Sequence, residues 1–444
     1  MSRLAVFGGE PVLGSALKPY NTIGEAEAEA VLRVVRSGNL SGFYGSWCDE
    51  YWGGPEVKSF EQAWTERFRV KHCVSVNSAT SALHACMGAI GISPGDEVIV
   101  PPVTMSATVM APLVYGGIPV FADLEAETFG LDPESVRKAI RSKTKAILAV
   151  NLFGHPARLD DLMSLAKKHH LYLIEDNAQG LLAEDQGRMA GTVGHIGVFS
   201  LNYHKHIHTG EGGLCVTNDD ELALRLKLIR NHGENVTANL GIRDLTNLVG
   251  FNLRLTELQA AIGREQLKRI DEHVSYRERI AEGLTEGLKD LEGLTVPSVR
   301  AGCRHVYYMW TFRYDEKILG VTRETFCRAL KAEGFPLEQG YVEPLYRLPL
   351  FRKRVAMGRE GFPFTLAPHV TYEDGICPVA ERLYEKENIV FQPCVYTVDD
   401  KTLELLIEAV RKVHRHRGEL KALEGPRKSG ERPSNAMGRG CLES

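Results

Sequence analysis

The sequence predicts an α/β protein: a mainly parallel sheet covered by helices on both faces, followed by a smaller C-terminal α/β domain. Between residues 74 and 217, short runs rich in β-branched residues alternate with helical patterns, which is how parallel sheets are built. Two of the runs, Ile147–Val150 and Leu171–Ile174, carry apolar residues on both sides, as strands in a doubly covered sheet require.

Seven strands and five helices are expected in this first region. The strands are Val74–Val76, Glu97–Val100, Pro119–Ala122, Ala146–Val150, Leu171–Glu175, Val198–Ser200 and Leu214–Thr217. The helices are Ala79–Ile90, Met105–Tyr115, Pro133–Ile140, Leu159–His169 and Asp219–Asn231. Helix boundaries support this division, because Asp219 stands where an N-cap belongs and Gly38 and Gly91 follow helical stretches as stop signals.

The second domain begins after a long helical pattern from Thr256 to about Leu288. Strands are expected there near Met309–Tyr314 and Ile389–Gln392. We therefore divide the chain into an N-terminal arm (1–22), a large domain (23–270), a small domain (271–420) and a disordered tail (421–444). The tail is expected to be disordered because it is rich in Gly, Pro, Ser, Arg and Lys and poor in large apolar groups.

The composition is that of a soluble globular protein, with 43% hydrophobic and 25% charged residues. Lys and Arg total 53 against 57 Asp and Glu, and this balance argues against a general nucleic-acid binder. No signal peptide and no apolar run of about 20 residues is present, so no membrane contact is expected. The nine cysteines are odd in number and lack a C-x-x-C pair, which favours reduced thiols in the cytoplasm.

Three segments that follow expected strands carry side chains suited to chemistry. Asp176 follows an apolar strand, where burial beside a cation would keep it ionised, although a turn or helix cap is the common use of such an aspartate. The segment Asn77–Ser81 opens a helix, whose free N–H groups and hydroxyls suit a phosphate or simply cap the helix. Lys205 follows the strand that ends at Ser200.

A lysine, a carboxylate and a phosphate cradle at the carboxyl ends of strands are what pyridoxal phosphate (PLP) requires. The lysine holds the cofactor as a Schiff base, and the carboxylate keeps the pyridine nitrogen protonated so that the ring accepts electrons. His204, His206 and His208 surround Lys205 and raise the alternative of a metal site. Their spacing does not give a complete ligand set, so no metal is expected.

The sequence resembles the DegT/StrS-type sugar aminotransferases, which are fold type I PLP enzymes. The resemblance covers Gly8 to about Arg417 and rests on motifs whose order and spacing both agree. They are Ser-x4-Lys-x4-Gly-Glu-Gly-Gly at 200–213, Glu-Asp-x-Ala-Gln at 175–179, Ser-x-Thr at 78–80, Pro-Gly-Asp-Glu-Val at 94–98 and Gly-Phe-Asn-Leu-Arg-Leu-Thr-Glu at 250–257.

The resemblance implies a role for each matching residue. Lys205 would hold the cofactor and, once displaced, would carry the proton between substrate and cofactor as general acid and base. Asp176 would pair with the pyridine nitrogen, and Gln179 would bond the ring hydroxyl. The phosphate would be held by Ala79, Thr80 and Ser200. Asn252 would reach the phosphate of a neighbouring subunit, so a homodimer with shared active sites is expected.

Two segments depart from the family pattern. Met105 stands where members often have an aromatic residue that stacks on the cofactor, and its flexible thioether could cover the ring instead. The aromatic segment Gly42–Gly54 is longer than in many members and is either a lid over the sugar or a packed surface loop. His155, Arg230 and His232 stand near the expected pocket, and a structural role is the alternative for each.

These expectations converge on a ping-pong aminotransferase. It would take an amino group from L-glutamate or L-glutamine and give it to a nucleotide-linked keto-sugar or a keto-cyclitol. A PLP-dependent sugar dehydratase of the same fold is the nearest alternative, but relatives with that activity carry His where this chain has Lys205. A non-catalytic regulator that binds PLP or a sugar would not need Lys205, Asp176 and Gln179 together. A metalloprotein built on the His204 cluster is the remaining alternative.

Overall fold

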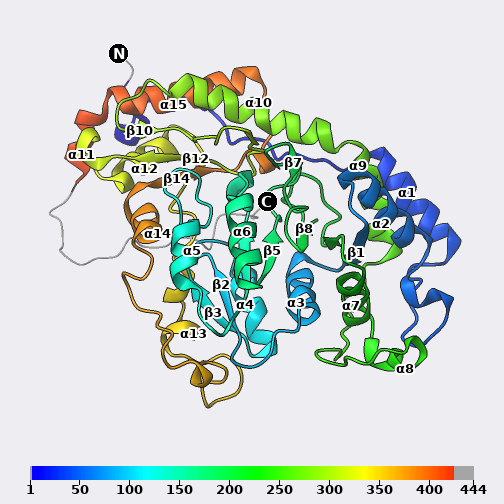
Figure 1. Cartoon of the computed structure of the whole chain (residues 1–444). Helices are drawn as coiled ribbons and strands as arrows, with labels where there is room; N and C mark the ends of the chain where they lie inside the picture. The colour runs from blue at the N-terminus through cyan, green and yellow to red at the C-terminus, as the bar shows by residue number, and fades with distance from the viewer. Residues whose placement is uncertain (1–2, 425–444) are drawn as a thin grey trace.

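The computed structural model describes residues 3–424 and is built around a seven-stranded sheet (Figure 1). In spatial order its strands are β1 (His72–Val76), β9 (Gly213–Thr217), β8 (Ile196–Ser200), β5 (Tyr172–Asp176), β4 (Thr144–Val150), β2 (Glu97–Val100) and β3 (Ile118–Phe121). Strands β8, β5, β4, β2 and β3 are parallel, which confirms the predicted mainly parallel sheet. Strand β9 is antiparallel to both of its neighbours.

The direction of β9 follows from its connection. Residues 201–212, between β8 and β9, contain no helix, and a parallel return usually needs a helical crossover of a dozen or more residues. The sequence predicted the strand but not its direction. As a consequence, the loop that carries Lys205 lies at the edge of the sheet where β5 and β4 also end.

Both faces of the sheet are buried by helices. Along β2, Val98 and Val100 belong to one apolar cluster with α3 (Ala79–Ala89) and α7 (Asp220–Arg230). Ile99 points the other way, into a second cluster that includes side chains of α2, α5, α6 and α9. The bounds of these helices are Pro55–Phe68, Pro133–Ala139, Leu159–His169 and Glu257–Lys268. Consecutive strand residues therefore face two separate cores, as the doubly apolar runs predicted.

Two predicted helices are divided. The helix expected over Met105–Tyr115 is α4 (Ser106–Met110) followed by the 3-10 turn Ala111–Tyr115, because Pro112 has no N–H to continue the α-helical bonds. The long helix expected from Thr256 is α9 followed by α10 (Ile270–Leu288), with Arg269 between them at φ −108° and ψ 11°. The Arg269 guanidinium donates to Thr22 O at 2.7 Å, which ties this break to the N-terminal arm.

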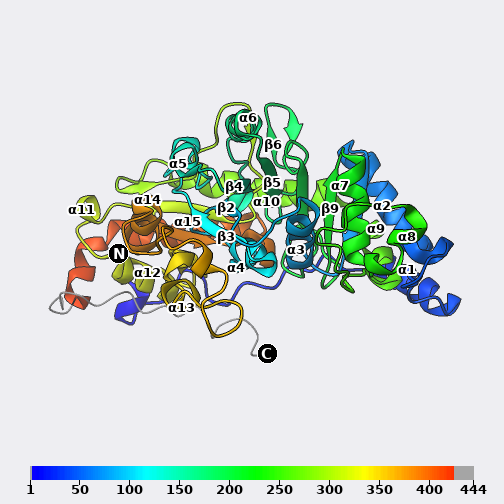
Figure 2. The same cartoon turned by 60° about the horizontal axis from the view of Figure 1, so that its bottom comes forward.

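A second, antiparallel sheet lies beyond α10. Its order is β10 (Leu294–Thr295), β12 (Trp310–Tyr314), β14 (Asn388–Phe391) and β13 (Glu338–Gln339), which confirms the strands predicted near 309–314 and 389–392. Figure 1 shows this sheet with α12 (Arg323–Ala332) and α15 (Asp400–Arg415) near it, and Figure 2 shows the same two helices from a second direction. A third small sheet joins β11 (Cys303–Arg304) to β6 (Glu184–Asp185) and β7 (Arg188–Met189). The remaining helices are α1 (Glu25–Ser37), α8 (Thr237–Leu240), α11 (Glu316–Leu319), α13 (Pro349–Arg352) and α14 (Pro378–Arg382).

The N-terminal arm is anchored by a buried ion pair. Glu333 is fully buried and accepts from Ala5 N at 2.8 Å and Val12 N at 3.0 Å. Lys412 Nζ donates to Glu333 Oε2 at 2.8 Å and to Glu10 O at 3.0 Å. The arm then reaches α9, where Thr22 O accepts from Gln266 Nε2 at 2.9 Å. It therefore contacts both halves of the chain.

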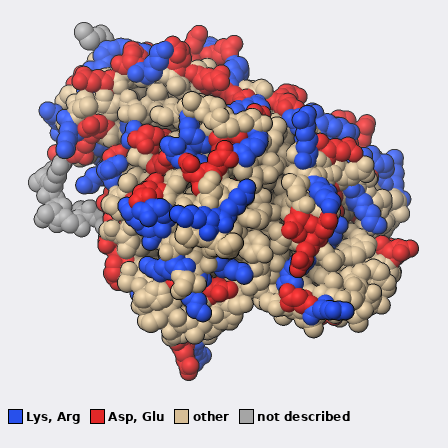
Figure 3. Space-filling model, in the orientation of Figure 1, with Lys and Arg blue, Asp and Glu red and all other residues tan. Residues whose placement is uncertain are grey.

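At the other end, a 3-10 helix spans Arg417–Leu423, whereas the sequence predicted a tail from Lys421. The rest of that predicted tail, residues 425–444, lies outside the described residues. Over the described range no helix is both long and apolar enough to span a membrane. On the face drawn in Figure 3, basic and acidic side chains are interspersed and form no single basic field.

Candidate active site

The segments predicted to carry chemistry meet where β5, β8 and the start of α3 come together. Asp176 is the last residue of β5 and is buried. Lys205 lies half-buried on the loop after β8, close enough for the two charges to affect one another. Within the described range, no ion pair directly joins Lys205 to Asp176.

The two oxygens of Asp176 have different environments. Oδ1 accepts from Ala178 N at 3.1 Å, which is the turn contact that such an aspartate commonly makes. Oδ2 accepts from the Thr108 hydroxyl at 2.7 Å, and this bond is buried. Burial raises the pKa of Asp176, and the two hydrogen bonds and the Lys205 charge oppose that shift. The turn interpretation therefore describes one oxygen, and the other oxygen contacts the Thr108 hydroxyl instead.

Lys205 is placed against an aromatic ring. Its Nζ lies 4.3 Å from the centroid of the buried Tyr308 ring. Burial lowers the pKa of Lys205 to about 8, although Asp176 and Cys394 act in the opposite direction. The lysine is therefore close to losing its proton near neutral pH, as an amine nucleophile must.

The chain segment that carries Tyr308 is hydrogen-bonded to the tight turn that follows β4. Val306 N donates to Gly154 O at 3.0 Å, and Met309 N donates to Phe153 O at 3.1 Å. Gly154 has φ 98°, and a Cβ there would lie 2.9 Å from Tyr308 N. A glycine at 154 is thus required to bring the chain segment of Tyr308 under Lys205.

Gln179 is held by both ends of its amide. Its Oε1 accepts from Phe153 N at 2.7 Å, and its Nε2 donates to the Tyr341 hydroxyl at 3.0 Å. Burial raises the pKa of Tyr341 to about 12, so its hydroxyl stays protonated. These bonds orient Gln179 beside Asp176, three residues away along the same strand end.

The start of α3 offers an open set of N–H groups. Ser78 caps the helix by accepting from Ser81 N at 3.0 Å, and Ser81 Oγ donates to Asn77 Oδ1 at 2.6 Å. The N–H groups of Ala79 and Thr80 belong to the first turn, which has no acceptors of its own. These groups are therefore available to an anion.

Gly213 joins this helix start to Ser200. It pairs in register with Ser200 of β8 and with Val76 of β1. A Cβ at Gly213 would lie 2.5 Å from Ala79 N, so a larger residue would displace the helix start. The structure thus brings together Ala79, Thr80 and Ser200, the three residues predicted to hold phosphate.

Met105 and Asn252 are on the surface. Met105 is the N-cap residue of α4 and is 62% exposed, an unusual position for a large apolar side chain. Asn252 is exposed and forms an isolated bridge with Asn231. Its neighbour Leu253 accepts from Asn77 N at 2.9 Å. Among the described residues, no hydrogen bond joins Asn252 to the loop that carries Lys205 in the same chain.

Several other residues singled out from the sequence have structural partners. Both ring nitrogens of His155 are engaged, at 2.8 Å from Pro156 O and 3.1 Å from Arg300 N. Arg230 is buried, and its guanidinium donates to Glu61 at 2.6 Å. His232 is half-exposed beside Glu234, with 3.4 Å between Nδ1 and Oε1.

The three histidines around Lys205 do not converge. His206 is buried, with Nδ1 3.7 Å from Cys394 Sγ, and His208 Nδ1 accepts from Gly210 N at 3.2 Å. His204 packs edge-on to Tyr203. Among residues 3–424, no three His, Cys, Asp or Glu side chains form a group that could hold a metal ion.

The aromatic segment 42–54 has a packed base and an exposed tip. Tyr51 is fully buried, and its carbonyl accepts from Asn231 Nδ2 at 2.8 Å. Tyr44 and Trp47 are 61% and 45% exposed. The packed-loop interpretation therefore describes the base at Tyr51, and a lid over the sugar stays a prediction for the exposed tip.

Sequence reasoning missed Thr108, Tyr308 and Tyr341. Thr108 stands two residues after Ser106, in the segment where Met105 was already a candidate cofactor contact. A hydroxyl side chain in this segment after β2 could have identified it. Tyr308 and Tyr341 come from chain segments more than 100 residues after Lys205. No local pattern marks them, because only the folded chain brings them to the site.

The sequence is similar to those of known aminotransferases. Residues 23–387 match the family model "DegT/DnrJ/EryC1/StrS aminotransferase family". GDP-perosamine synthase of Caulobacter vibrioides is 38% identical over 297 residues, 67% of this chain and 78% of the relative. L-glutamine:2-deoxy-scyllo-inosose aminotransferase of Streptoalloteichus tenebrarius is 34% identical over 441 residues, 94% of this chain and 99% of the relative.

Solved structures give the same result. DesI with its TDP-sugar product has a TM-score of 0.79 at 28% identity, covering 95% of this chain and 98% of that one. A GDP-4-keto-6-deoxymannose-3-dehydratase with a trapped PLP–glutamate geminal diamine has a TM-score of 0.72 at 26% identity, covering 89% and 100%. Because the family model spans most of the sequence, the chain belongs to the DegT/DnrJ/EryC1/StrS aminotransferase family.

Proposed function

We propose that the chain is a PLP-dependent aminotransferase that moves an amino group from L-glutamine or L-glutamate to a keto-cyclitol or a nucleotide-linked keto-sugar. The observation that carries the proposal is the placing of Lys205, with its lowered pKa, near the buried carboxylate of Asp176 and the open start of α3. These are the three groups that a PLP enzyme needs, and they meet at the carboxyl end of the parallel strands.

The residues present fit this cofactor. Asp176 Oδ2, which is held by the Thr108 hydroxyl, would face the pyridine nitrogen. Gln179 would face the ring hydroxyl. The phosphate would lie on the N–H groups of Ala79 and Thr80 and the Ser200 hydroxyl. When bound, PLP supplies an electron sink that stabilises negative charge on the substrate carbon.

Lys205 would do two things in turn. Its amine, with a pKa of about 8, would hold the cofactor covalently until the amino group of the donor takes its place. Once free, the same amine stands over the Tyr308 ring and can take a proton from the substrate carbon or return it. A pKa near the working pH suits a group that must act in both directions.

Donor and acceptor are proposed from the relatives. The relative aligned over 441 residues is named for L-glutamine and a scyllo-inosose, and the perosamine synthase is named for a GDP-linked product. A dehydratase is also among the structural neighbours. The family resemblance implies that relatives with dehydratase activity carry a histidine where this chain has Lys205. Lys205 therefore favours amino transfer.

We also propose the remaining features of the functional unit. Residues 23–270 would form the PLP-binding domain and 271–420 the smaller domain. Two chains would form a homodimer, with Asn252 of each reaching the phosphate in the other, and Met105 would cover the cofactor ring. The exposure of Asn252 and Met105 supports this arrangement, since neither contributes to the core of its own chain. The described free cysteines fit a cytoplasmic protein.

The test is the visible spectrum of the purified protein with PLP, followed during addition of L-glutamine or L-glutamate and then of an acceptor. A Schiff-base band that disappears with a donor and returns with a keto-cyclitol or keto-sugar is expected. A band that no donor changes, together with loss of a hydroxyl from a sugar, would instead identify a dehydratase. No band after adding PLP would refute the proposal.

A further inference from the structure

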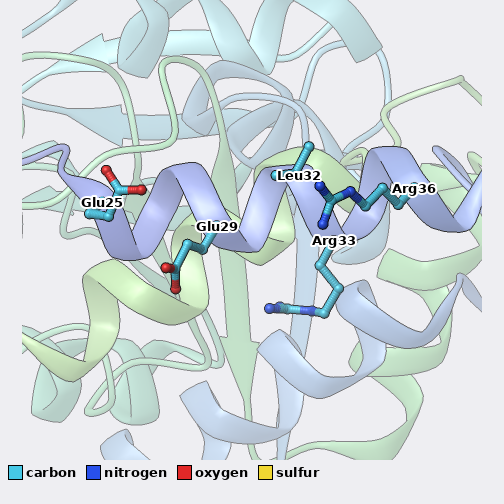
Figure 4. Close-up of a pocket in the computed structure, with 5 residues that line it drawn as sticks. All are labelled: Glu25, Glu29, Leu32, Arg33 and Arg36. Carbon is cyan, nitrogen blue, oxygen red and sulfur yellow. The ribbon is translucent and has the colours of Figure 1, made fainter.

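Among the described residues, nothing buries the outer side of helix α1. The helix packs on α9 through the buried residues Glu27, Ala30 and Val34. The opposite side carries Glu25, Glu29, Leu32, Arg33 and Arg36, which line a surface hollow of about 520 Å³. Figure 4 shows these five side chains following one another along the helix. None of them belongs to the candidate active site.

The spacing on this side is that of a helix–helix contact. Glu25, Glu29, Leu32 and Arg36 are separated by four, three and four residues, the spacing that aligns side chains along one seam of a paired helix. Leu32 is 45% exposed, and Val35 beside this seam is 52% exposed. Two apolar side chains therefore lie on the solvent side of a helix that already has a core-facing side.

The charges on this side of α1 are complementary to those on the same side of a second, antiparallel copy. The acidic residues, Glu25 and Glu29, occupy the first half of the seam and the basic residues, Arg33 and Arg36, the second half. In an antiparallel pair of identical helices, Glu25 would face Arg36 and Glu29 would face Arg33, because both pairs share nearly the same midpoint along the sequence. A two-fold axis requires this kind of self-complementary surface.

We propose that the outer side of α1 binds the same side of α1 in a second copy of this chain, with the two helices antiparallel and Leu32 near the two-fold axis. The charged groups are available for this contact. Among residues 3–424, Glu25, Glu29 and Arg36 form no ion pair. Arg33 is 3.4 Å from Glu56, which already has a closer partner in Arg264 at 2.7 Å.

The helix dipole also favours acids near the start of a helix and bases near its end. It does not explain why Leu32 and Val35 are exposed, and it makes a different prediction about exchanged charges. The proposal does not depend on the enzymatic activity, and it concerns a surface without Asn252, Met105 or Lys205.

Charge reversal in the full chain tests the contact by sedimentation velocity. E25R/E29R makes the seam entirely basic, and R33E/R36E makes it entirely acidic. Each variant alone should weaken self-association by at least about tenfold, because like charges then face one another. A mixture of the two should associate again. The quadruple variant E25R/E29R/R33E/R36E should also associate, although its charges now oppose the helix dipole.

The control is E404R/E408R, which reverses two exposed acids with the same spacing on α15 and should leave association unchanged. Circular dichroism of each variant establishes that it is folded. Loss of association in both double variants with recovery in the mixture supports the antiparallel pair, whether the change is from dimer to monomer or from tetramer to dimer. Unchanged association in the double variants, or no recovery in the mixture, overturns it.

Discussion

Among the described residues, Lys412 lies near the carboxylate of Glu333 and Lys205 near that of Asp176, and these two places are built differently. At the N-terminal arm, Lys412 contacts Glu333 at 2.8 Å, and the same carboxylate also accepts from Ala5 N and Val12 N. At the end of β5, Lys205 and Asp176 influence one another without a direct ion pair among the described contacts. The first pair is joined by a direct ion pair, and the second is not.

This difference separates stability from chemistry. A buried charge pair with all its hydrogen bonds made holds its surroundings in one arrangement. A half-buried lysine over an aromatic ring, and a carboxylate that accepts only from the Ala178 N–H and the Thr108 hydroxyl, keep capacity for a ligand. Removing Lys205 should therefore lower the activity, and removing Lys412 should lower the stability of the fold.

The largest effect is expected for Lys205→Ala. Transamination should fall by at least about 10³-fold, because both the attachment of the cofactor and the acid–base step are lost. Stopped-flow absorbance after mixing with L-glutamine measures the first half-reaction. Lys145→Ala is the matched control, because its Nζ also lies over a tyrosine ring, that of Tyr172, at 5.8 Å. Equal rates in the two variants would contradict the proposed role of Lys205.

The next largest effect is expected for Lys412→Met. The Glu333 carboxylate would stay buried without its cation, and the free energy of unfolding should fall by about 3–5 kcal/mol. Urea unfolding followed by fluorescence measures the change. Lys401→Met, on the exposed side of the same helix, should change the stability little. A loss below about 1 kcal/mol for Lys412→Met would show that the arm anchor does not stabilise the fold.

A smaller effect is expected for Asp176→Asn. An amide cannot provide the negative charge, and loss of a hydrogen bond to a charged group costs about 1.5–3 kcal/mol, or roughly 10- to 100-fold in rate. The turnover number and the affinity for PLP should both fall while the fold is retained. Asp219→Asn is the control, since asparagine also caps α7. Full activity of Asp176→Asn would remove Asp176 from the site.

The smallest effect is the pH dependence of cofactor attachment. Only the neutral amine of Lys205 attacks, and burial lowers its pKa from 10.5 to about 8. The rate of attachment to the cofactor-free protein should therefore rise about tenfold per pH unit below 8 and level off above it. The appearance of the visible band measures this rate. A rate that still rises tenfold between pH 9 and 10 would show that the lysine is not shifted.

The fold could be predicted in large part because burial on both faces leaves a clear pattern. The runs at 146–150 and 171–175 lie within or overlap β4 and β5, and the helix predicted over Asp219–Asn231 is α7 with Asp219 as its cap. The direction of β9 and the break at Arg269 could not be predicted in this way. The direction of β9 depends on the short connection 201–212 and on pairing with β1, and the break at Arg269 depends on a partner distant in the sequence, Thr22.

The candidate site divides in the same manner. Asp176, Lys205 and the start of α3 could be predicted because each follows a strand, and strand ends meet at one edge of a parallel sheet. The residues that hold them were not predicted. Thr108 reaches Asp176 across 68 residues of sequence, and Tyr341 reaches Gln179 across 162. Such contacts depend on the packing of side chains and leave no trace in the local pattern.

The anchor of the N-terminal arm also sets an order of events during synthesis. Glu10 is separated from Lys412 by 402 residues, and Ala5 from Glu333 by 328. On the ribosome the arm is made long before either partner exists, so it must wait until α12 and α15 have emerged. The main sheet can form in the meantime. The N-terminal arm, which contacts both halves of the chain, can bind its partners only when translation has passed Lys412.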